Sequence, residues 1–338
     1  MFDSNLLAEM KKAGYVNVQK HPSQDLFIYN YSSTAQYDRI WNEVTLQCRG
    51  LILDAENNVV ARPFKKFFNL GEQENQYLPN EAFEVYEKMD GSLGILYWIN
   101  NDPFIATRGS FTSEQSVKAN EILNSKYAHA LKNLKKENTY LFEIIYPENR
   151  IVVDYGKTED LVLLSVIDKK TGEDVALEDI GFPMVKRFDG INDINKLAAL
   201  EENNKEGFVI KFKDGLRYKV KFKEYVRIHR IISQVSNVSI WEYLKTGQSL
   251  NELLDRVPDE FYNWVKKTNN DFLAAYAEIE NKAKAEFKIL EDRKETALYF
   301  MQCAYPQVMF NMLDKKEYSE TIWKMLRPKY SKPFSEVE

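Results

Sequence analysis

Lys88 opens a five-residue segment, Lys88-Met89-Asp90-Gly91-Ser92, whose residue types suit covalent chemistry at an amine. Residues 83–87 mix β-branched, aromatic and charged side chains, and residues 93–99 are strongly apolar. This pattern predicts two strands joined by an Asp-Gly turn, with the amine at the end of a sheet. An amine held there can attack the α-phosphate of a nucleotide and carry the nucleotide as a phosphoramidate. An ordinary exposed hairpin contains the same residues, so this segment alone leaves both interpretations open.

A covalent nucleotide carrier also needs carboxylates and cations, and two further segments supply them. Glu143 lies in the apolar run 140–145, where a carboxylate is costly to bury unless it is paired or binds a ligand or metal. Lys219 and Lys221 follow an Asp-Gly turn and are two apart on a predicted strand, so both side chains face the same way. The alternatives are a structural salt bridge for Glu143 and a basic outer hairpin face for the lysines.

Several motifs follow one another in the chain and strengthen the first interpretation. They are 48–50 (Cys-Arg-Gly), 65–69 (Lys-Lys-Phe-Phe-Asn), 88–92 (Lys-Met-Asp-Gly-Ser), 107–110 (Thr-Arg-Gly-Ser), 142–143 (Phe-Glu), 206–209 (Glu-Gly-Phe-Val) and 218–222 (Tyr-Lys-Val-Lys-Phe). This ordered set covers about residues 25–230 and resembles the covalent nucleotidyltransferases, and within them the phage-type RNA ligase 1 family of tRNA-repair ligases. The serine after Lys-x-Asp-Gly and the Lys-Phe-Phe-Asn stretch point to that family rather than to DNA ligases or capping enzymes.

The resemblance implies a role for each matching residue. Lys88 is the expected nucleophile, and Lys219 and Lys221 are the expected catalytic cations. The ATP contacts that it implies are Tyr29, Arg49, Lys66, Arg108, Glu143, Glu206, Lys219 and Lys221, and the metal contacts, direct or through water, are Glu143 and Glu206.

Two of these assignments have an alternative or depart from the family pattern. A core aromatic explains Tyr29 as well as a phosphate contact does. Arg108 stands where the family more often has lysine. Arginine keeps the positive charge but presents it in a different geometry. Asp90 is assigned no chemistry, because Asp-Gly is favoured in turns for its own backbone reasons. Val209 and the run 161–166 are candidate walls of an adenine slot, although a strand core would look the same.

The reaction implied by the resemblance is ATP-dependent RNA ligation with Mg²⁺ or Mn²⁺, in RNA repair and tRNA repair. Lys88 attacks the α-phosphate of ATP, AMP passes to an RNA 5′-phosphate, and a 3′-hydroxyl then displaces AMP. Burial and neighbouring cations must lower the lysine pKa from its usual value of about 10.4. The expected partner is RNA with 5′-phosphate and 3′-hydroxyl ends. No Gly-x-x-x-x-Gly-Lys-Ser/Thr loop is present, so a separate end-healing kinase/phosphatase is expected to supply the 5′-phosphate.

Two rival functions remain at this stage. One is another covalent nucleotidyltransferase, of the DNA ligase or capping type, which usually carries an OB-type domain instead of helices. The other is a non-catalytic RNA-binding module that has kept the fold. The intact set of nucleophile, carboxylates and lysines argues against the second rival, because a decayed site would be expected to lose at least one member.

The predicted fold class is α+β. An adenylyltransferase domain over residues 1–225, with ATP-grasp-like antiparallel sheets and flanking helices, precedes an all-helical C-terminal domain over 226–338. Hairpins are predicted at 100–103 and 213–215. Helices are predicted from a Thr112 capping box through the charged stretch 132–137, near 194–202, and over 270–304.

Composition limits the class of protein. The 338 residues carry a net charge of −5, so any RNA contact must come from local basic patches. Two cysteines, Cys48 and Cys303, make neither a disulfide framework nor a zinc site, and they suit a reducing compartment. No apolar run has membrane-spanning length, and residues 1–4 resemble no signal segment. The expected location is therefore cytoplasmic, with no membrane partner.

Overall fold

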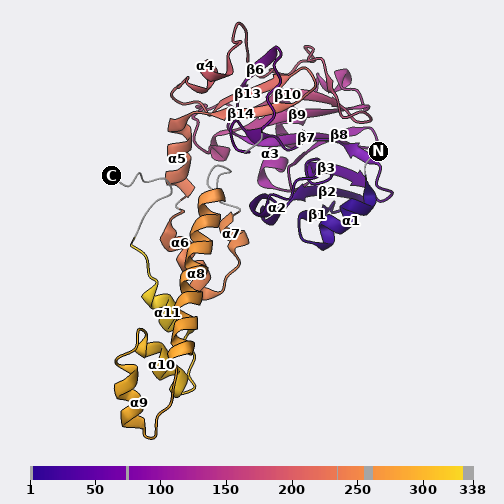
Figure 1. Cartoon of the computed structure of the whole chain (residues 1–338). Helices are drawn as coiled ribbons and strands as arrows, with labels where there is room; N and C mark the ends of the chain where they lie inside the picture. The colour runs from indigo at the N-terminus through magenta and orange to yellow at the C-terminus, as the bar shows by residue number, and fades with distance from the viewer. Residues whose placement is uncertain (1–2, 74–75, 234, 255–261, 330–338) are drawn as a thin grey trace. The chain divides into compact units, whose positions relative to one another are not determined.

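The structure, a computed structural model, describes residues 3–73, 76–233, 235–254 and 262–329. The chain divides into two compact units, Met1–His229 (unit 1) and Arg230–Glu338 (unit 2) (Figure 1). The division falls close to residue 225, where the sequence changes from strand-like to helical character. Among the described residues, no helix is both long enough and apolar enough to span a membrane.

The described strands of unit 1 form three sheets. Sheet A has the order β1-β2-β3-β4: Val16–Lys20, Leu26–Tyr31, Arg49–Asp54 and Val59–Ala61. Sheet B has the order β12-β6-β13-β14-β5: Arg187–Phe188, Phe83–Lys88, Gly207–Phe212, Arg217–Lys221 and Phe68–Asn69. Sheet C has the order β11-β10-β9-β7-β8: Asp174–Val175, Asp160–Asp168, Asn138–Ile145, Ser92–Ile99 and Asp102–Thr107. Neighbouring strands are antiparallel apart from the parallel pair β14–β5, so the expected mixture of antiparallel sheets and helices is confirmed.

Two predicted hairpins are present. β7 and β8 pair across the turn at Asn100, which adopts a positive φ of 53°. β13 and β14 pair across the Asp214-Gly215 turn, and Gly215 has a φ of 84°. Both turns therefore contain a residue in the left-handed region, which Asn and Gly tolerate best.

Helices in unit 1 cover the sheets. They are α1 (Ser4–Lys12), α2 (Ser33–Asp38), α3 (Glu114–Lys126), α4 (Ile194–Ala198) and the first part of α5 (Lys223–Ser233). The predicted capping box at Thr112 is wrong, because Ser113 caps α3 by accepting a hydrogen bond from the Ser116 amide. The charged stretch 132–137 does not continue that helix; it leads through a short 3₁₀ turn into β9. The helix predicted near 194–202 is α4, although it is shorter.

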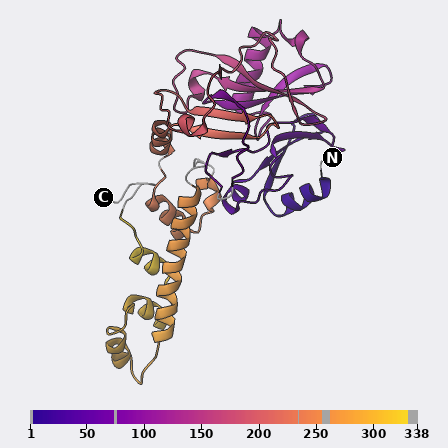
Figure 2. The same cartoon turned by 45° about the horizontal axis from the view of Figure 1, so that its top comes forward.

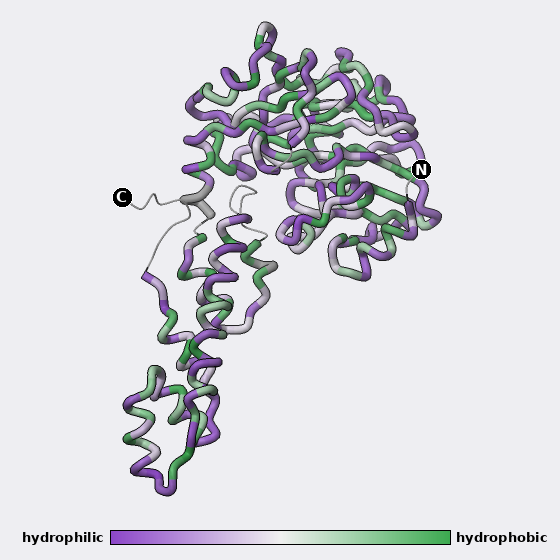
Figure 3. Tube along the Cα trace, in the orientation of Figure 1, coloured by the Kyte–Doolittle hydropathy of each residue, from purple (hydrophilic) through white to green (hydrophobic). Residues whose placement is uncertain are grey.

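The cores explain why the sheets stack. α3 packs its apolar side onto one face of sheet C, where Leu123 and Phe142 are fully buried (Figure 1). The opposite face of sheet C packs against sheet A. In sheet B, alternate residues of β13 and β14 form a second core that includes Phe208 and Phe222. Hydrophobic stretches accordingly follow the strands of unit 1 (Figure 3).

The regular elements described within unit 2 are helices. They are α6 (Asn237–Thr246), α7 (Leu250–Leu254), α8 (Tyr262–Glu286), α9 (Arg293–Phe300), α10 (Pro306–Leu313) and α11 (Ser319–Met325). The single helix predicted over 270–304 is wrong in its bounds. α8 begins earlier and ends at Glu286, and Asp292 caps a new helix by accepting a hydrogen bond from the Glu295 amide.

The packing of α3 on sheet C predicts a large stability effect. Leu123 is fully buried in this core, so Leu123→Ala should lower the free energy of unfolding by about 2–5 kcal/mol. Leu200→Ala is the matched control, because Leu200 is 43% exposed and its truncation should change stability by less than about 0.5 kcal/mol. Chemical denaturation monitored by fluorescence measures both. Equal losses in the two variants would contradict the described packing.

Candidate active site

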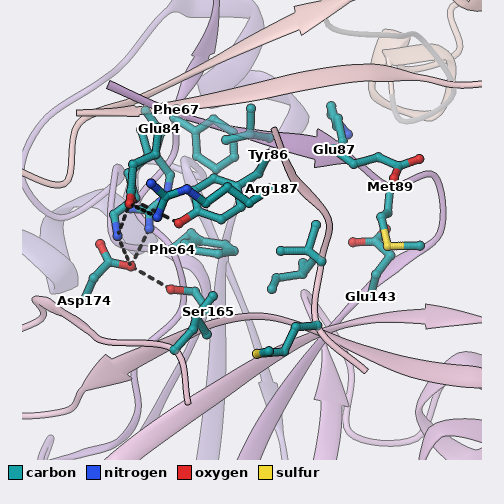
Figure 4. Close-up of a pocket in the computed structure, with 18 of the residues that line it drawn as sticks. Phe64, Phe67, Glu84, Tyr86, Glu87, Met89, Glu143, Ser165, Asp174 and Arg187 are labelled. Atoms are coloured by element: carbon teal, nitrogen blue, oxygen red, sulfur yellow. Dashed lines mark hydrogen bonds and ion pairs between the residues drawn. The ribbon is translucent and has the colours of Figure 1, made fainter. Parts of the chain in front are cut away.

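A cavity of about 630 Å³ lies in unit 1 between sheet B and sheet C. Lys88 and Glu143 line one part of it, and Glu84, Asp174 and Arg187 line another. Figure 4 shows this separation, with Glu143 and Met89 on one side of the view and the cluster around Asp174 on the other. Volumes of about 300–1,000 Å³ are typical of small-molecule sites, so the cavity is large enough for a nucleotide.

Lys88 lies at the end of β6, as its sequence pattern predicts. Its side chain is 20% exposed, and its Nζ lies 2.7 Å from Glu206 Oε2. Lys221 approaches the same carboxylate, with its Nζ 3.4 Å from Glu206 Oε1. The strand register explains this meeting, because Gly207 pairs with Lys88 on one side and with Lys221 on the other. Figure 2 shows the salmon strands of this sheet, β13 and β14, side by side. A buried carboxylate therefore lies between two lysines.

Gly207 is required at this junction by its backbone. Its φ is +147°, and a Cβ built on it would lie 1.9 Å from the Val220 carbonyl oxygen. Backbone atoms cannot move aside as the end of a flexible side chain can, so any larger residue would separate β13 from β14. The glycine allows both lysine-bearing strands to approach Glu206 closely.

Glu143 points into the cavity from β9 and is almost fully buried. Its Oε1 accepts a hydrogen bond of 2.8 Å from the Gly91 amide. Burial raises the pKa of Glu143 to about 7, although the nearby Lys88 ammonium lowers it. Glu206 adds a repulsive charge that also raises this pKa. A carboxyl group in this position titrates near neutral pH and favours a neighbouring cation.

Asp90 has a structural role that the sequence did not indicate. It is buried, its Oδ2 accepts hydrogen bonds of 2.8 Å from the Val152 and Val153 amides, and its Oδ1 accepts one of 2.8 Å from the Tyr225 hydroxyl. Its own amide donates to the Tyr155 hydroxyl. Asp90 thus connects the turn after Lys88 to a distant loop and to α5. The partners are 62 to 135 residues away, so local sequence carries no signal for them.

A second row of residues crosses sheet B beyond Lys88. The register places Val209 between Tyr86 and Lys219, two residues from the row of Lys88 and Lys221. All of these residues line the cavity, whereas Tyr218 and Val220 belong to the core on the other face. The predicted alternation of β14 is therefore confirmed. Val209 lines the cavity, as does Leu164 from the predicted wall 161–166.

The predicted phosphate-binding cations gather around aromatic rings. The Arg49 guanidinium lies 5.6 Å and the Lys219 Nζ 6.0 Å from the centre of the Phe67 ring. Lys66 and Arg108 lie 5.4 Å and 5.6 Å from the Tyr31 ring. Arg49 and Lys219 line the first cavity, whereas Lys66 and Arg108 are not part of its lining.

Tyr29 lies elsewhere. It is buried in the core between sheet A and α1, together with Leu51 and Met10, and it is not among the residues that line the first cavity. Its neighbour two positions on, Tyr31, is the tyrosine that contacts Lys66 and Arg108. Tyr29 therefore has the surroundings of a core aromatic, which was the alternative to a phosphate contact. The phosphate contact remains a prediction.

An ionic network that the sequence did not reveal lies at the far part of the cavity. Asp174 of β11 accepts hydrogen bonds from Arg217 of β14 and from Ser165 of β10. Arg187 lies 2.7 Å from Glu84 Oε1, and the Tyr86 hydroxyl donates to Glu84 Oε2 at 3.0 Å (Figure 4). The Asp174 contacts join sheet B to sheet C. Burial alone would raise the pKa of Asp174, but Arg217 and Ser165 lower it below its ordinary value.

The family of the chain follows from comparison with known proteins. The family model described as RNA ligase, of the phage T4 RNA ligase 1 type, matches residues 47–226. This chain belongs to the RNA ligase family. The matched region contains Lys88, Glu143, Glu206 and the two lysines of β14, so the RNA ligase match and the cavity coincide.

Individual relatives agree with the RNA ligase family. The chain is 30% identical over 251 residues to a proposed bifunctional polynucleotide kinase/RNA ligase of Autographa californica nuclear polyhedrosis virus, covering 66% of the chain and 36% of that protein. It is 29% identical over 250 residues to a proposed RNA ligase of Thermovibrio ammonificans, covering 69% and 65%. The chain therefore spans less than two thirds of the length of both relatives. A solved Naegleria gruberi RNA ligase mutant with ATP and Mn is 21% identical, with a TM-score of 0.37, covering 44% of this chain and 51% of that one.

The buried Glu143 predicts a pH-dependent stability. Its pKa is raised to about 7, so the folded state binds more protons than the unfolded state between its ordinary pKa and about 7. Stability contributed by the protonated group is present at low pH and is lost as the pH rises to about 7. Glu143→Gln keeps an amide oxygen for the Gly91 N–H but cannot ionise, so it should avoid this loss, which is on the order of 3 kcal/mol.

Denaturation of metal-free protein across the pH range measures this effect. The stability advantage of Glu143→Gln over wild type should grow with pH and level off above about pH 7. The exposed Glu9→Gln variant removes one carboxylate from α1 and serves as the control. A constant difference between Glu143→Gln and wild type at every pH would contradict the described burial.

Proposed function

We propose that this chain is an ATP-dependent RNA ligase that joins RNA 5′-phosphate and 3′-hydroxyl ends, and that it serves RNA repair. The observation that carries the proposal is the Lys88 amine, 2.7 Å from the buried Glu206 carboxylate, in a cavity that combines cations with an apolar wall. Membership of the RNA ligase family supports this assignment. Adenylyl transfer is assigned to the first unit, and the helical second unit is proposed to be a distinct C-terminal domain.

The first step transfers AMP from ATP to Lys88. Lys88 Nζ, once deprotonated, forms a bond to the α-phosphorus of ATP, the bond from that phosphorus to the bridging oxygen breaks, and pyrophosphate leaves. Lys219 and Lys221 lie on the same face of β14 and offset the charge that develops on the phosphate oxygens. Arg49 and Lys66 extend this set of cations toward the leaving pyrophosphate. Val209 and Leu164 supply the apolar wall for the base.

The site suits a divalent metal held by few protein ligands. No group of three or more His, Cys, Asp or Glu side chains in the described part of the chain is arranged to hold a metal. Glu143 and Glu206 are both buried, and burial together with the Glu206 charge raises the pKa of Glu143. A bound cation would offset this repulsion, and magnesium commonly takes one or two carboxylates plus phosphates and water. These two residues would hold Mg²⁺ or Mn²⁺, which would neutralise phosphate charge.

The later steps need RNA ends of defined chemistry. The 5′-phosphate oxygen of one RNA attacks the lysyl-AMP phosphorus and releases Lys88, and the 3′-hydroxyl of the second end then forms the phosphodiester and releases AMP. A kinase must supply the 5′-phosphate, and the viral relative combines a kinase with its ligase by name. We therefore propose that a separate end-healing kinase/phosphatase is a partner of this chain. The free cysteines, Cys48 and Cys303, suit a reducing, cytoplasmic compartment.

The nucleophile assignment gives a direct test. Freshly purified, AMP-free protein incubated with Mg²⁺ and ATP labelled on the α-phosphate should show a labelled band on a denaturing gel. Lys88→Ala should show none, because no other amine replaces the lost bond to phosphorus. Lys12→Ala, in the exposed last turn of α1, removes a lysine outside the cavity and should label as wild type does.

Labelling with either nucleotide and sealing of RNA or DNA together separate the rival functions. Labelling by GTP in preference to ATP would favour a capping-type enzyme, and sealing of nicked DNA in preference to RNA would favour a DNA ligase. No label in wild-type protein would exclude the covalent mechanism and favour a non-catalytic RNA-binding module.

A further inference from the structure

A second cavity, of about 1030 Å³, lies in unit 1 beside the first. Phe64, Phe67 and Arg217 line both cavities, so the two adjoin. Of the residues that line only the second cavity, the proposed ATP site uses Lys66 alone. The combined space exceeds the range of about 300–1,000 Å³ that is typical of small-molecule sites, which points to a longer ligand.

The stereochemistry of the proposed reaction indicates which ligand reaches this space. In an in-line displacement, the entering and leaving groups lie on opposite sides of the phosphorus. Pyrophosphate therefore leaves opposite Lys88 in the first step. When AMP is later transferred, Lys88 is the leaving group, so the RNA 5′-phosphate must enter from the side that pyrophosphate vacated. The cations for pyrophosphate thus mark the entry of RNA.

Those cations lead from the first cavity into the second. Arg49 and Lys219 line the first cavity and lie on the Phe67 ring, which is shared by both. Lys66, the next predicted phosphate contact, lines the second cavity and not the first. Lys65 and Lys213 continue the series on the exposed part of the second cavity.

The second cavity also carries features of a site for single strands. Five basic residues line it against three acidic ones (Glu173, Asp174 and Asp214), and Asp174 is already bonded to Arg217. Tyr77, whose side chain is 70% exposed, lies at the same cavity. Its backbone oxygen accepts a hydrogen bond of 2.5 Å from the Tyr218 hydroxyl, which holds this segment against β14. Cations that follow the backbone and aromatic rings on which bases stack are the usual means of holding single strands.

We propose that this second cavity binds the single-stranded RNA whose 5′-phosphate accepts AMP. The proposal rests on the proposed ligase function and adds to it the path of one substrate. The terminal phosphate occupies the former pyrophosphate position beside Lys66 and Lys219, and the following nucleotides pass Lys65, Lys213 and Tyr77. Formation of lysyl-AMP involves no RNA and therefore does not depend on the last three residues.

The double variant Lys65→Ala/Lys213→Ala tests this path. Both lysines are exposed, and neither has a salt bridge among the described residues. Binding of a fluorescent, 5′-phosphorylated single-stranded RNA should weaken, and the slope of log affinity against log salt should fall in magnitude by about 1.4, because two phosphate contacts are lost. Lys12→Ala/Lys132→Ala changes the net charge equally at exposed positions outside both cavities and should leave the slope unchanged.

Further measurements separate the path from the ligase function. Tyr77→Ala should weaken RNA binding by at least about fivefold through lost stacking. In single-turnover AMP transfer, a 5′-phosphorylated dinucleotide should react alike with wild type and the double variant, whereas a longer oligonucleotide should lose its advantage in the variant. Lysyl-AMP formation with ATP alone shows that each variant is folded and active in the first step.

The outcomes are distinct. Lysyl-AMP formation in wild type, with RNA affinity and salt slope in Lys65→Ala/Lys213→Ala equal to those in the control, would overturn the RNA path and leave the ligase function intact. Absence of lysyl-AMP in wild type would instead overturn the ligase function on which the path depends. A loss of affinity in the double variant and in Tyr77→Ala, with adenylylation retained, supports the path.

Discussion

The carboxylate of Glu206 is the interaction on which the rest of the site depends. It is buried, and it contacts Lys88 at 2.7 Å and Lys221 at 3.4 Å. Removing a carboxylate from water costs several kcal/mol unless charges and hydrogen bonds compensate, so the fold must keep both lysines beside it. This requirement holds the end of β6, the start of β13 and the end of β14 together. The absence of a side chain at Gly207 makes their close approach sterically feasible.

A second constraint fixes the direction of the amine. Asp90 is bonded to the backbone of Val152 and Val153 and to the Tyr225 hydroxyl, and Glu143 accepts the Gly91 amide. The turn that follows Lys88 is therefore held from several elements. A nucleophile gains most when its position is fixed before the substrate binds. Asp90 and Tyr225 thus position Lys88, the proposed nucleophile, through the backbone of the turn.

The sequence indicated those parts of the site that follow from local periodicity. The strand–turn–strand around Lys88 and the shared face of Lys219 and Lys221 depend on alternation along one strand, and both are found. The surroundings of the tyrosines in β2 were less accessible, because a bulge between Tyr29 and Asn30 interrupts the pairing of β2 with β3. Tyr31 contacts the cations, whereas Tyr29 lies in the core.

Features that depend on distant pairing were not predictable from local patterns. The bonds of Asp174 to Arg217 and to Ser165 join two sheets, and no short segment of sequence contains both partners of the first bond. The starts of α3 and α9 are a different case, since the N-caps Ser113 and Asp292 determine them. Such caps are readable in the sequence, but competing capping residues nearby made the helix bounds ambiguous.

The cavity is more basic than the chain that forms it. Seven basic residues line it against four acidic ones, Glu84, Glu87, Glu143 and Asp174, although the whole chain has a net charge of −5. Ion pairs lie at both parts of the site: Glu84 and Asp174 contact Arg187 and Arg217 at the far part, and the buried Glu206 contacts Lys88 and Lys221 at the other. Low-dielectric walls strengthen a local field of this kind, so the excess of basic groups favours an anionic ligand in the cavity.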